Sequence, residues 1–190
     1  EFTHVNFSYG TDSHIVLKDI SFKVKPRQKI GLVGPTGSGK STLLSLIQGH
    51  HHVDNGAISL DDNNTRTMDK RHLRLNVSFV GTENTFFTES IRENILRPLP
   101  TASMERLVWV SKMVGLHDIV QNYPDTYETL LEEGGRNLPT NHLQKIALAR
   151  ALIRNPKILL MDEATSGMGL EGEQSIKQYM PEICSGRTVI

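Results

Sequence analysis

The first part of the chain alternates apolar and polar residues with the period of β-strands. Residues 1–9 and residues 17–24 both place apolar side chains at every second or third position. Such alternation is typical of strands with one buried face, and we expect these two segments to pair antiparallel. Short apolar runs at Ile30–Val33 and Ala57–Leu60 predict two further strands.

The later part of the chain combines helical spacing with short, continuously apolar runs. Residues 84–152 carry apolar side chains at helical spacing and little strand signal, which predicts a helical insertion. Helices are also predicted from about Lys40 to Gln48 and over residues 171–183. The remaining apolar runs predict buried strands within Leu73–Val80, at Ile158–Met161 and beginning at Thr188–Ile190.

One stretch between a predicted strand and a predicted helix carries candidate chemistry. Gly34–Thr42 reads Gly-Pro-Thr-Gly-Ser-Gly-Lys-Ser-Thr and fits the phosphate-loop pattern G-x-x-x-x-G-K-[ST]. Glycines let backbone N–H groups face a phosphate without Cβ clashes, and the helix that starts here adds its positive dipole end. The alternative, a glycine-rich turn with an incidental lysine, does not account for the strand before it and the helix after it. We therefore expect a nucleotide to bind here.

The residues of this stretch divide between phosphate and metal binding. We expect Lys40 to reach the β- and γ-phosphates and the Ser41 hydroxyl to bind Mg²⁺. The candidate nucleotide-binding residues of the stretch are Gly34, Pro35, Thr36, Gly37, Ser38, Gly39, Lys40, Ser41 and Thr42.

An acidic pair, Asp162 and Glu163, follows the apolar run Ile158–Met161. The carboxyl ends of buried parallel strands are where α/β sheets place their chemistry. Asp162 is suited to hold Mg²⁺ through water, and Glu163 is suited to polarise an attacking water. Such a pair alone is usually a polar turn, but beside a phosphate loop the catalytic interpretation is favoured. The candidate catalytic residues are therefore Glu163 and Lys40, and the candidate metal ligands are Ser41 and Asp162.

These motifs and the elements around them predict an α/β fold. It consists of a P-loop NTPase core with a mainly parallel sheet, an antiparallel β subdomain and an inserted α-helical subdomain. We expect residues 1–83 to form the β subdomain and the phosphate-loop part of the core. Residues 84–152 would form the helical subdomain, and residues 153–190 the acidic-pair part of the core.

Composition narrows the classes of function that remain. Lysine plus arginine equals aspartate plus glutamate, 21 each among 190 residues, so there is no general electrostatic case for a nucleic-acid partner. No apolar stretch approaches the roughly 20 residues that span a bilayer, and the lone Cys184 excludes an internal disulfide framework. Both ends look cut, as in a piece of a longer protein. The triple histidine His50–His52 is interpreted as an exposed turn rather than a zinc site, because neighbouring side chains on an extended loop point apart.

Together the motifs resemble the nucleotide-binding domain of ABC transporters, most closely the exporter type, over nearly the whole chain. Residues 34–42 look like Walker A, residues 158–163 look like Walker B with the catalytic glutamate, and residues 144–152 look like the signature helix. Phe7–Tyr9 resembles the segment whose aromatic side chain stacks on adenine, so the resemblance implies that Tyr9 contacts the base. It also implies that the chain binds ATP and Mg²⁺.

Three loops depart from the family pattern. Leu138–His142 stands where the family has Leu-Ser-Gly-Gly-Gln, and Pro139 removes both a hydroxyl and a backbone N–H. Thr82 occupies the position of the Q-loop glutamine and is too short to reach Mg²⁺. Ser166–Gly169 ends in glycine where the D-loop of the family ends in aspartate. The switch histidine would lie beyond Ile190.

The resemblance implies the ATP-binding and hydrolysing domain of an exporter at the cytoplasmic face of a membrane. Its partners would be a transmembrane domain and a second nucleotide-binding domain, in a homo- or heterodimer. The intact residues serve this chain's own site, and the altered signature and D-loops serve the partner's site, as expected of a heterodimer half. Thr82 argues against this, because it weakens the chain's own site as well. The alternative is a degenerate regulatory half with little hydrolysis, which Pro139, Thr82 and Gly169 favour. A third option is a soluble ABC protein that acts on ribosomes or in DNA repair. Such a protein would be expected to have a second nucleotide-binding cassette or basic extensions, and the sequence shows neither.

Overall fold

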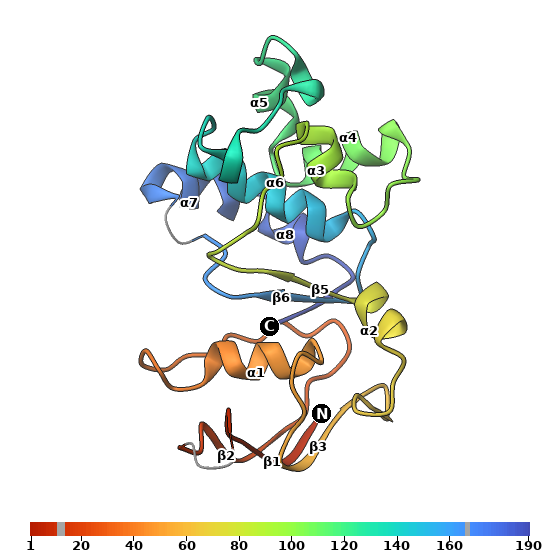
Figure 1. The fold of residues 1–190 in the computed structure, drawn as a ribbon, viewed down its shortest axis with the longest axis vertical. Coiled ribbons are helices and arrows are strands. Elements are labelled where there is room, and N and C mark those ends of the chain that lie inside the picture. The colour runs from red at the N-terminus through yellow and green to blue at the C-terminus, as the bar shows by residue number, and fades with distance from the viewer. Residues whose placement is uncertain (11–13, 166–167) are drawn as a thin grey trace.

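The computed structural model describes residues 1–10, 14–165 and 168–190. Figure 1 shows strands β1–β3 and helix α1 at one end, strands β5 and β6 in the middle, and most of the other helices beyond them. The α/β class expected from the sequence is confirmed, with one antiparallel sheet and one parallel sheet.

The antiparallel sheet is built from the strands near the N-terminus. Its order is β2-β1-β3-β4, and each neighbouring pair runs antiparallel, as predicted for the first two strands. Gly56 in β3 has a φ of 82°, and a Cβ there would lie 2.3 Å from the carbonyl oxygen of His4, so this crossing requires glycine. The strands are β1 (Phe2–Phe7), β2 (Leu17–Phe22), β3 (Asn55–Leu60) and β4 (Asn63–Asn64).

The parallel sheet has the order β5-β6-β7 and is covered on both faces. Val80 and Leu159 pack into the core beneath the helices, whereas Val77 and Leu160 pack into a second core with α1 and the antiparallel sheet. Burial on both faces of a parallel sheet explains why β6, its central strand, is continuously apolar. The strands are β5 (Val77–Val80), β6 (Ile158–Met161) and β7 (Thr188–Val189).

Helix α1 (Lys40–Ile47) begins directly after the phosphate loop, within the predicted bounds. It ends in a hydrogen-bonded cap in which Gly49, with φ of 70°, donates to Leu46 and His50 donates to Ser45. Gly49 therefore closes the C-terminal end of α1. Within the described residues, the preceding segment Ile30–Val33 is not a regular strand, contrary to expectation. Beside β7 the described residues show only an isolated bridge between Lys29 and Val189, where Ile30 also donates to the Val189 carbonyl oxygen, so no continuous ladder forms along this segment.

The predicted helical insertion is confirmed over residues 84–152, where the structure assigns helices and no regular strand. Helix α3 begins with a capping box in which Ser90 and Glu93 exchange hydrogen bonds, which fixes its start. The helices are α3 (Ile91–Leu96), α4 (Met104–Met113), α5 (His117–Gln121), α6 (Thr140–Leu152) and the 3₁₀ turns η1 (Thr126–Glu128) and η2 (Glu133–Gly135).

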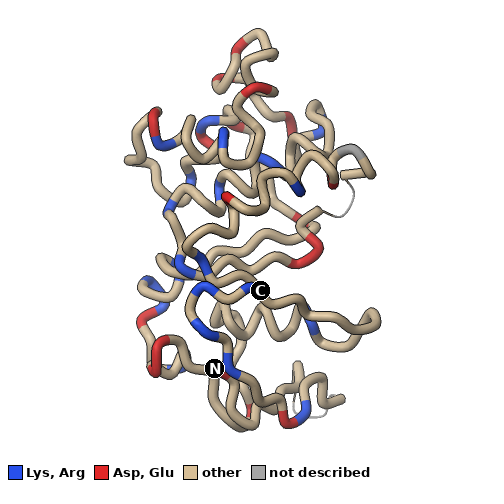
Figure 2. The backbone as a smooth tube through the Cα atoms, turned by 180° about the vertical axis from the view of Figure 1, so that it is seen from behind, with Lys and Arg blue, Asp and Glu red and all other residues tan. Residues whose placement is uncertain are grey.

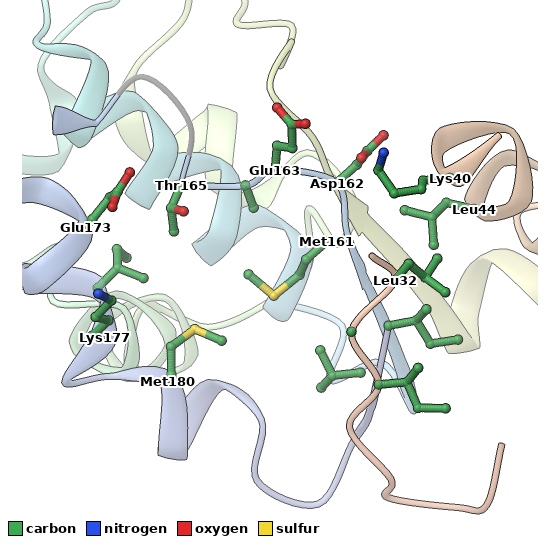
Figure 3. Close-up of a pocket in the computed structure, with 16 residues that line it drawn as sticks. Leu32, Lys40, Leu44, Met161, Asp162, Glu163, Thr165, Glu173, Lys177 and Met180 are labelled. Atoms are coloured by element: carbon green, nitrogen blue, oxygen red, sulfur yellow. The ribbon is translucent and has the colours of Figure 1, made fainter. Parts of the chain in front are cut away.

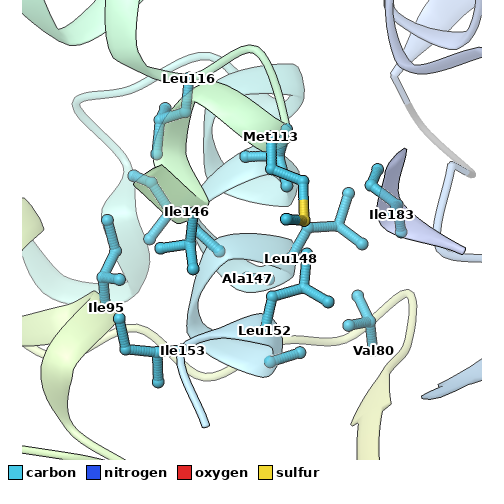
Figure 4. Close-up of a cluster of buried hydrophobic side chains, with 14 of the residues drawn as sticks. Val80, Ile95, Met113, Leu116, Ile146, Ala147, Leu148, Leu152, Ile153 and Ile183 are labelled. Atoms are coloured by element: carbon cyan, nitrogen blue, oxygen red, sulfur yellow. The ribbon is translucent and has the colours of Figure 1, made fainter. Parts of the chain in front are cut away.

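Helix α6 runs through the centre of the larger hydrophobic core. Figure 4 shows Ile146, Leu148 and Leu152 surrounded by side chains from other elements, among them Ile95 of α3 and Val80 of β5. All three α6 side chains are fully buried, and each contributes roughly 1.5–3 kcal/mol by leaving water. The signature region is thus held by packing that does not depend on the sequence of its first turn.

One other predicted element differs from expectation, and one helix was not predicted. Residues 171–183 form two helices, α7 (Gly169–Lys177) and α8 (Met180–Ile183), rather than one. Pro181 lies in the first turn of α8, where its missing N–H is tolerated, whereas a continuous helix would need that donor. Part of the segment before β5 forms helix α2 (Lys70–Asn76), because Asp69 accepts from Arg71 and starts a helix there.

Charged residues of both signs occur at both ends of the molecule, as Figure 2 shows. This agrees with the formal net charge of +0. Among the described residues, no helix is both long enough and apolar enough to cross a membrane.

Candidate functional site

The phosphate loop is exposed, and its glycines adopt backbone angles that other residues rarely reach. Gly37 and Gly39 have φ of 80° and 89°, and Ser38 donates its backbone N–H to Pro35. A Cβ on Gly39 would lie 2.8 Å from the Leu17 side chain, so both φ and space require glycine at this position. The loop therefore has the open backbone that phosphate binding needs.

Helix α1 presents an uncapped N-terminus to this loop. Its N-cap is Gly39, which has no side chain to satisfy the first N–H groups. An anion at this end would take up those donors and meet the positive end of the helix dipole. Ser41 is exposed in the first turn, and Thr42 is buried beside it. The arrangement fits a phosphate group bound at the helix N-terminus, with the Ser41 hydroxyl beside it.

The Lys40 side chain folds back over the loop. Its Nζ donates to the carbonyl oxygens of Gly34 and Pro35, at 2.9 Å in both cases. The ammonium group is thereby held over the space that the loop encloses, where it would meet a bound phosphate.

A cavity of about 450 Å³ brings the phosphate-loop lysine together with the acidic pair. Lys40 at the start of α1 and Asp162 and Glu163 after β6 all line it. Figure 3 shows the Lys40 and Asp162 side chains on the same side of this cavity, with Glu163 above them. Thus residues more than a hundred positions apart in the sequence line one cavity.

The acidic pair is placed by the end of the parallel sheet. The backbone N–H of Asp162 donates to Val80 at 2.9 Å, which extends the β5–β6 ladder to the carboxylate. Glu163 follows with a φ of 49°, in the left-handed region that a non-glycine residue rarely adopts. Such strain concentrates at functional positions, and Glu163 is also exposed.

The residues available for Mg²⁺ are a hydroxyl and a carboxylate. Ser41 and Asp162 offer hard oxygen ligands, which Mg²⁺ takes in small numbers together with phosphate oxygens and water. Among the described residues no group of three or more histidine, cysteine, aspartate or glutamate side chains is arranged for a metal. The hydroxyl and the carboxylate are thus of the chemical type that Mg²⁺ accepts together with phosphate oxygens.

Tyr9 does not line this cavity but is joined to α1 next to it. Its hydroxyl and the Thr42 hydroxyl lie 2.9 Å apart, and its ring stands edge-on to Phe7 at 5.0 Å between centroids. The ring is also edge-on to His51 at 5.4 Å, and the Tyr9 residue is 60% exposed. The structure thus leaves the aromatic surface of Tyr9 accessible to a ligand near the phosphate loop.

The altered signature stretch forms the beginning of α6. Pro139 is the N-cap and makes no side-chain capping bond, while His142 and Leu143 donate to its carbonyl oxygen at 3.0 and 3.1 Å. His142 is held by the Tyr123 hydroxyl, 2.6 Å from Nδ1. Burial, and to a smaller extent the charge of Lys145, lowers the pKa of His142. The helix is intact, so the departure from the family pattern lies in the chemistry of its first turn.

The altered Q-loop position is exposed, and its neighbours bind α6 instead. Thr82 is not among the residues that line the cavity. Asn84 donates to the carbonyl of Gly81 at 2.7 Å and to Gln144 of α6 at 2.8 Å. This network fastens the loop after β5 to the signature helix.

Some predicted residues stay apart, and some cavity residues were not predicted. Tyr9 and Thr82 stay outside the cavity that holds the catalytic candidates, and of the phosphate-loop candidates only Lys40 lines it, so Ser41 is not among its lining residues. Thr165 and Glu173 line the cavity and were not predicted. Neither residue belongs to a sequence motif that would have predicted its place at the cavity. The D-loop interpretation of Ser166–Gly169 falls partly outside the described residues.

The comparisons with known proteins agree with one another over most of the chain. The family described as ABC transporter matches residues 17–166. The toxin RTX-III translocation ATP-binding protein of Actinobacillus pleuropneumoniae is 41% identical over 189 residues, which cover 100% of this chain and 27% of that protein. The leukotoxin translocation ATP-binding protein of Mannheimia glucosida is 40% identical with the same coverage. The chain thus spans about a quarter of the length of these relatives.

A solved structure supports the same relationship. The structure of a bacterial Atm1-family ABC exporter with ATP bound superposes with a TM-score of 0.93 at 32% sequence identity. The match covers 100% of this chain and 33% of the exporter chain.

Proposed function

Because this chain belongs to the ABC transporter family, we propose that it is the ATP-binding and ATP-hydrolysing domain of an exporter. The observation that carries this proposal is the shared cavity of Lys40, Asp162 and Glu163. It joins a phosphate loop to an acidic pair, the combination that phosphoryl transfer to water requires.

In this proposal the phosphate loop binds and orients the triphosphate. The uncapped N–H groups of α1 and the glycine backbone donate to phosphate oxygens, and Lys40 exchanges its loop carbonyls for the β- and γ-phosphates. The exposed face of Tyr9 stacks on adenine. The two ends of the nucleotide would thus be bound by different residues, the base by Tyr9 and the phosphates by the phosphate loop and Lys40.

Hydrolysis is assigned to the residues after β6. Glu163 accepts the proton of a water that attacks the γ-phosphate, and its position two residues beyond the end of β6 leaves it exposed to solvent. Ser41 and Asp162 would hold Mg²⁺, which neutralises developing charge on the phosphates when it is bound.

We further propose that the chain pairs with a second nucleotide-binding domain and drives a transmembrane domain at the cytoplasmic face of a membrane. The first turn of α6, which would cap the partner's γ-phosphate, lacks a hydroxyl and carries side chains at Thr140 and Asn141. The dipole of α6 survives because the helix is intact. Such a chain would hydrolyse ATP in its own cavity and complete the partner's site poorly, as one half of a heterodimer.

A second candidate is a regulatory half that binds ATP with little hydrolysis. It is favoured by the exposed Thr82, which replaces the glutamine that the family uses to hold the attacking water. Both candidates predict ATP binding, and they differ in turnover.

The two are separated by measuring ATP turnover of the chain alone and mixed with a nucleotide-binding domain that has an intact Leu-Ser-Gly-Gly-Gln loop. The proposed function predicts turnover that appears on mixing and disappears in Glu163→Gln. ATP binding without turnover in every pairing would support the regulatory candidate. Failure to bind ATP at all would contradict both.

A further inference from the structure

The loop after α1 places His51 against the proposed adenine-contacting residue. We propose that His51 is a positioning residue that holds the Tyr9 ring in the orientation needed to receive the base. This inference rests on the proposed function, since it assigns a role toward the nucleotide bound at that same site.

Three side chains from different parts of the chain fix the Tyr9 ring. Thr42 holds its hydroxyl at 2.9 Å, and Phe7 and His51 meet its ring edge-on, at interplanar angles of 81° and 88°. The His51 ring also meets that of Phe7, at 5.6 Å. Three aromatic rings therefore form one cluster. A tyrosine that is 60% exposed would otherwise sample several rotamers.

The same loop also holds the backbone that carries Tyr9. The Asp54 carboxylate accepts from both the backbone N–H and the hydroxyl of Ser8, at 2.8 Å each. The backbone N–H of Asp54 in turn donates to Asn6 at 3.0 Å. Thus the segment from His51 to Asp54 fastens the residues on either side of the β1 terminus, and His51 is the part of it that reaches the Tyr9 ring.

The depression beside this cluster is open to a planar ligand. Phe7, Tyr9 and His51 line it together with Ser8, Gly10, His52 and Asp54. His50 and His52 make no ring contact with the cluster among the described residues, so the role is specific to the middle histidine. His51 lies on the base side of the nucleotide and not among the residues of the Lys40 cavity. Its effect should therefore depend on the presence of a base.

Inorganic tripolyphosphate, which has the phosphates of ATP but no base, separates the two parts of the site. We expect His51→Ala to weaken ATP binding by the full chain about three- to ten-fold, the range of one lost aromatic pair. Binding of tripolyphosphate should not change. His51→Phe, which retains a planar ring, should bind ATP as the wild type does, and His50→Ala should match the wild type for both ligands.

A double-mutant cycle gives a readout that a merely structural role would not move. In a Tyr9→Ala background, His51→Ala should cause no further loss of ATP affinity, because the ring that it positions is gone. Equal ATP affinity of His51→Ala and the wild type would overturn the inference. So would an equal loss for ATP and tripolyphosphate, or an undiminished effect without Tyr9. If the wild type binds tripolyphosphate but gains nothing from the base, Tyr9 and His51 are both misassigned. A wild type that binds neither ligand contradicts the proposed function itself.

Discussion

The Nζ of Lys40 lies 2.9 Å from the carbonyl oxygen of Gly34, so the phosphate-loop lysine is already satisfied before any nucleotide binds. A phosphate must replace this neutral acceptor with a charged one, and hydrogen bonds to charged acceptors are the stronger kind. The lysine therefore favours a bound triphosphate while being kept over the loop in its absence.

Replacing Lys40 tests the role of this ammonium group. Lys40→Ala should weaken ATP binding about ten- to hundred-fold, because a charge-assisted bond contributes about 1.5–3 kcal/mol. Titration calorimetry with ATP measures the effect. Lys18→Ala, which removes an exposed lysine of β2, serves as the control and should bind as the wild type does. Unchanged affinity in Lys40→Ala would remove the lysine from the proposed site.

Replacing Pro139 at the start of α6 measures how much stability an N-cap side chain would add there. A serine there can accept from the first backbone N–H groups of α6, whereas an alanine cannot. Both changes lose the rigidity of proline equally, so that effect cancels in their comparison. Pro139→Ser should therefore be more stable than Pro139→Ala by about 1 kcal/mol in urea unfolding. Equal stability of the two variants would mean that the first turn of α6 is satisfied in another way.

His142 predicts a pH dependence of stability. Burial lowers its pKa, with a smaller effect of the Lys145 charge, so the folded chain binds fewer protons here than the unfolded chain. The contribution of His142 is therefore fully present above its unfolded pKa, near 6.5, and is lost as the pH falls through the lower folded-state pKa. The free energy of unfolding of the wild type, relative to His142→Gln, should be larger at about pH 7.5 than at about pH 5.

Urea unfolding of both proteins at the two pH values checks this. Glutamine keeps a polar group near the Tyr123 hydroxyl but does not titrate. A difference between wild type and variant that stays constant with pH would show that His142 has the same pKa in both states.

Two glycines with similar backbone angles separate backbone strain from packing. Gly115 and Gly134 have φ of 64° and 69°, but only at Gly115 would a Cβ meet another side chain, with Tyr179 at 2.2 Å. Gly134→Ala should cost about 1 kcal/mol through φ alone. Gly115→Ala should cost more, about 2–4 kcal/mol, because the Tyr179 ring must also move. Thermal or urea unfolding compares them, and equal losses would mean that Tyr179 moves freely.

The sequence predicted elements that are fixed by local pattern. The bounds of β6 and the start of α1 follow from a continuous apolar run and from a glycine-rich loop, and both are as expected. The strand expected at Ile30–Val33 does not form, because a strand depends on a pairing partner and the described residues give this segment only an isolated bridge at Lys29. Periodicity reports which face is buried but not which segment pairs with it.

Contacts between distant segments could not be predicted from the local sequence pattern. The phosphate loop and the acidic pair were assigned to one site because their residue types are complementary, and the cavity of Lys40 and Glu163 agrees with this. His51, in contrast, was interpreted only as part of an exposed turn. Its contact with Tyr9 joins residues 42 positions apart and follows from how the loop after α1 meets β1, which no local pattern encodes.

The most direct test of the account is ATP turnover and ATP affinity of Glu163→Gln, measured in a mixture with a partner domain whose signature loop is intact. Glu173→Gln is the matched control, since Glu173 lines the same cavity from α7 and has no assigned role. The account predicts that Glu163→Gln binds ATP within about two-fold of the wild type. Its turnover should fall about a hundred-fold or more, as expected for loss of a general base, while Glu173→Gln keeps wild-type turnover. Equal turnover of Glu163→Gln and the wild type would contradict it.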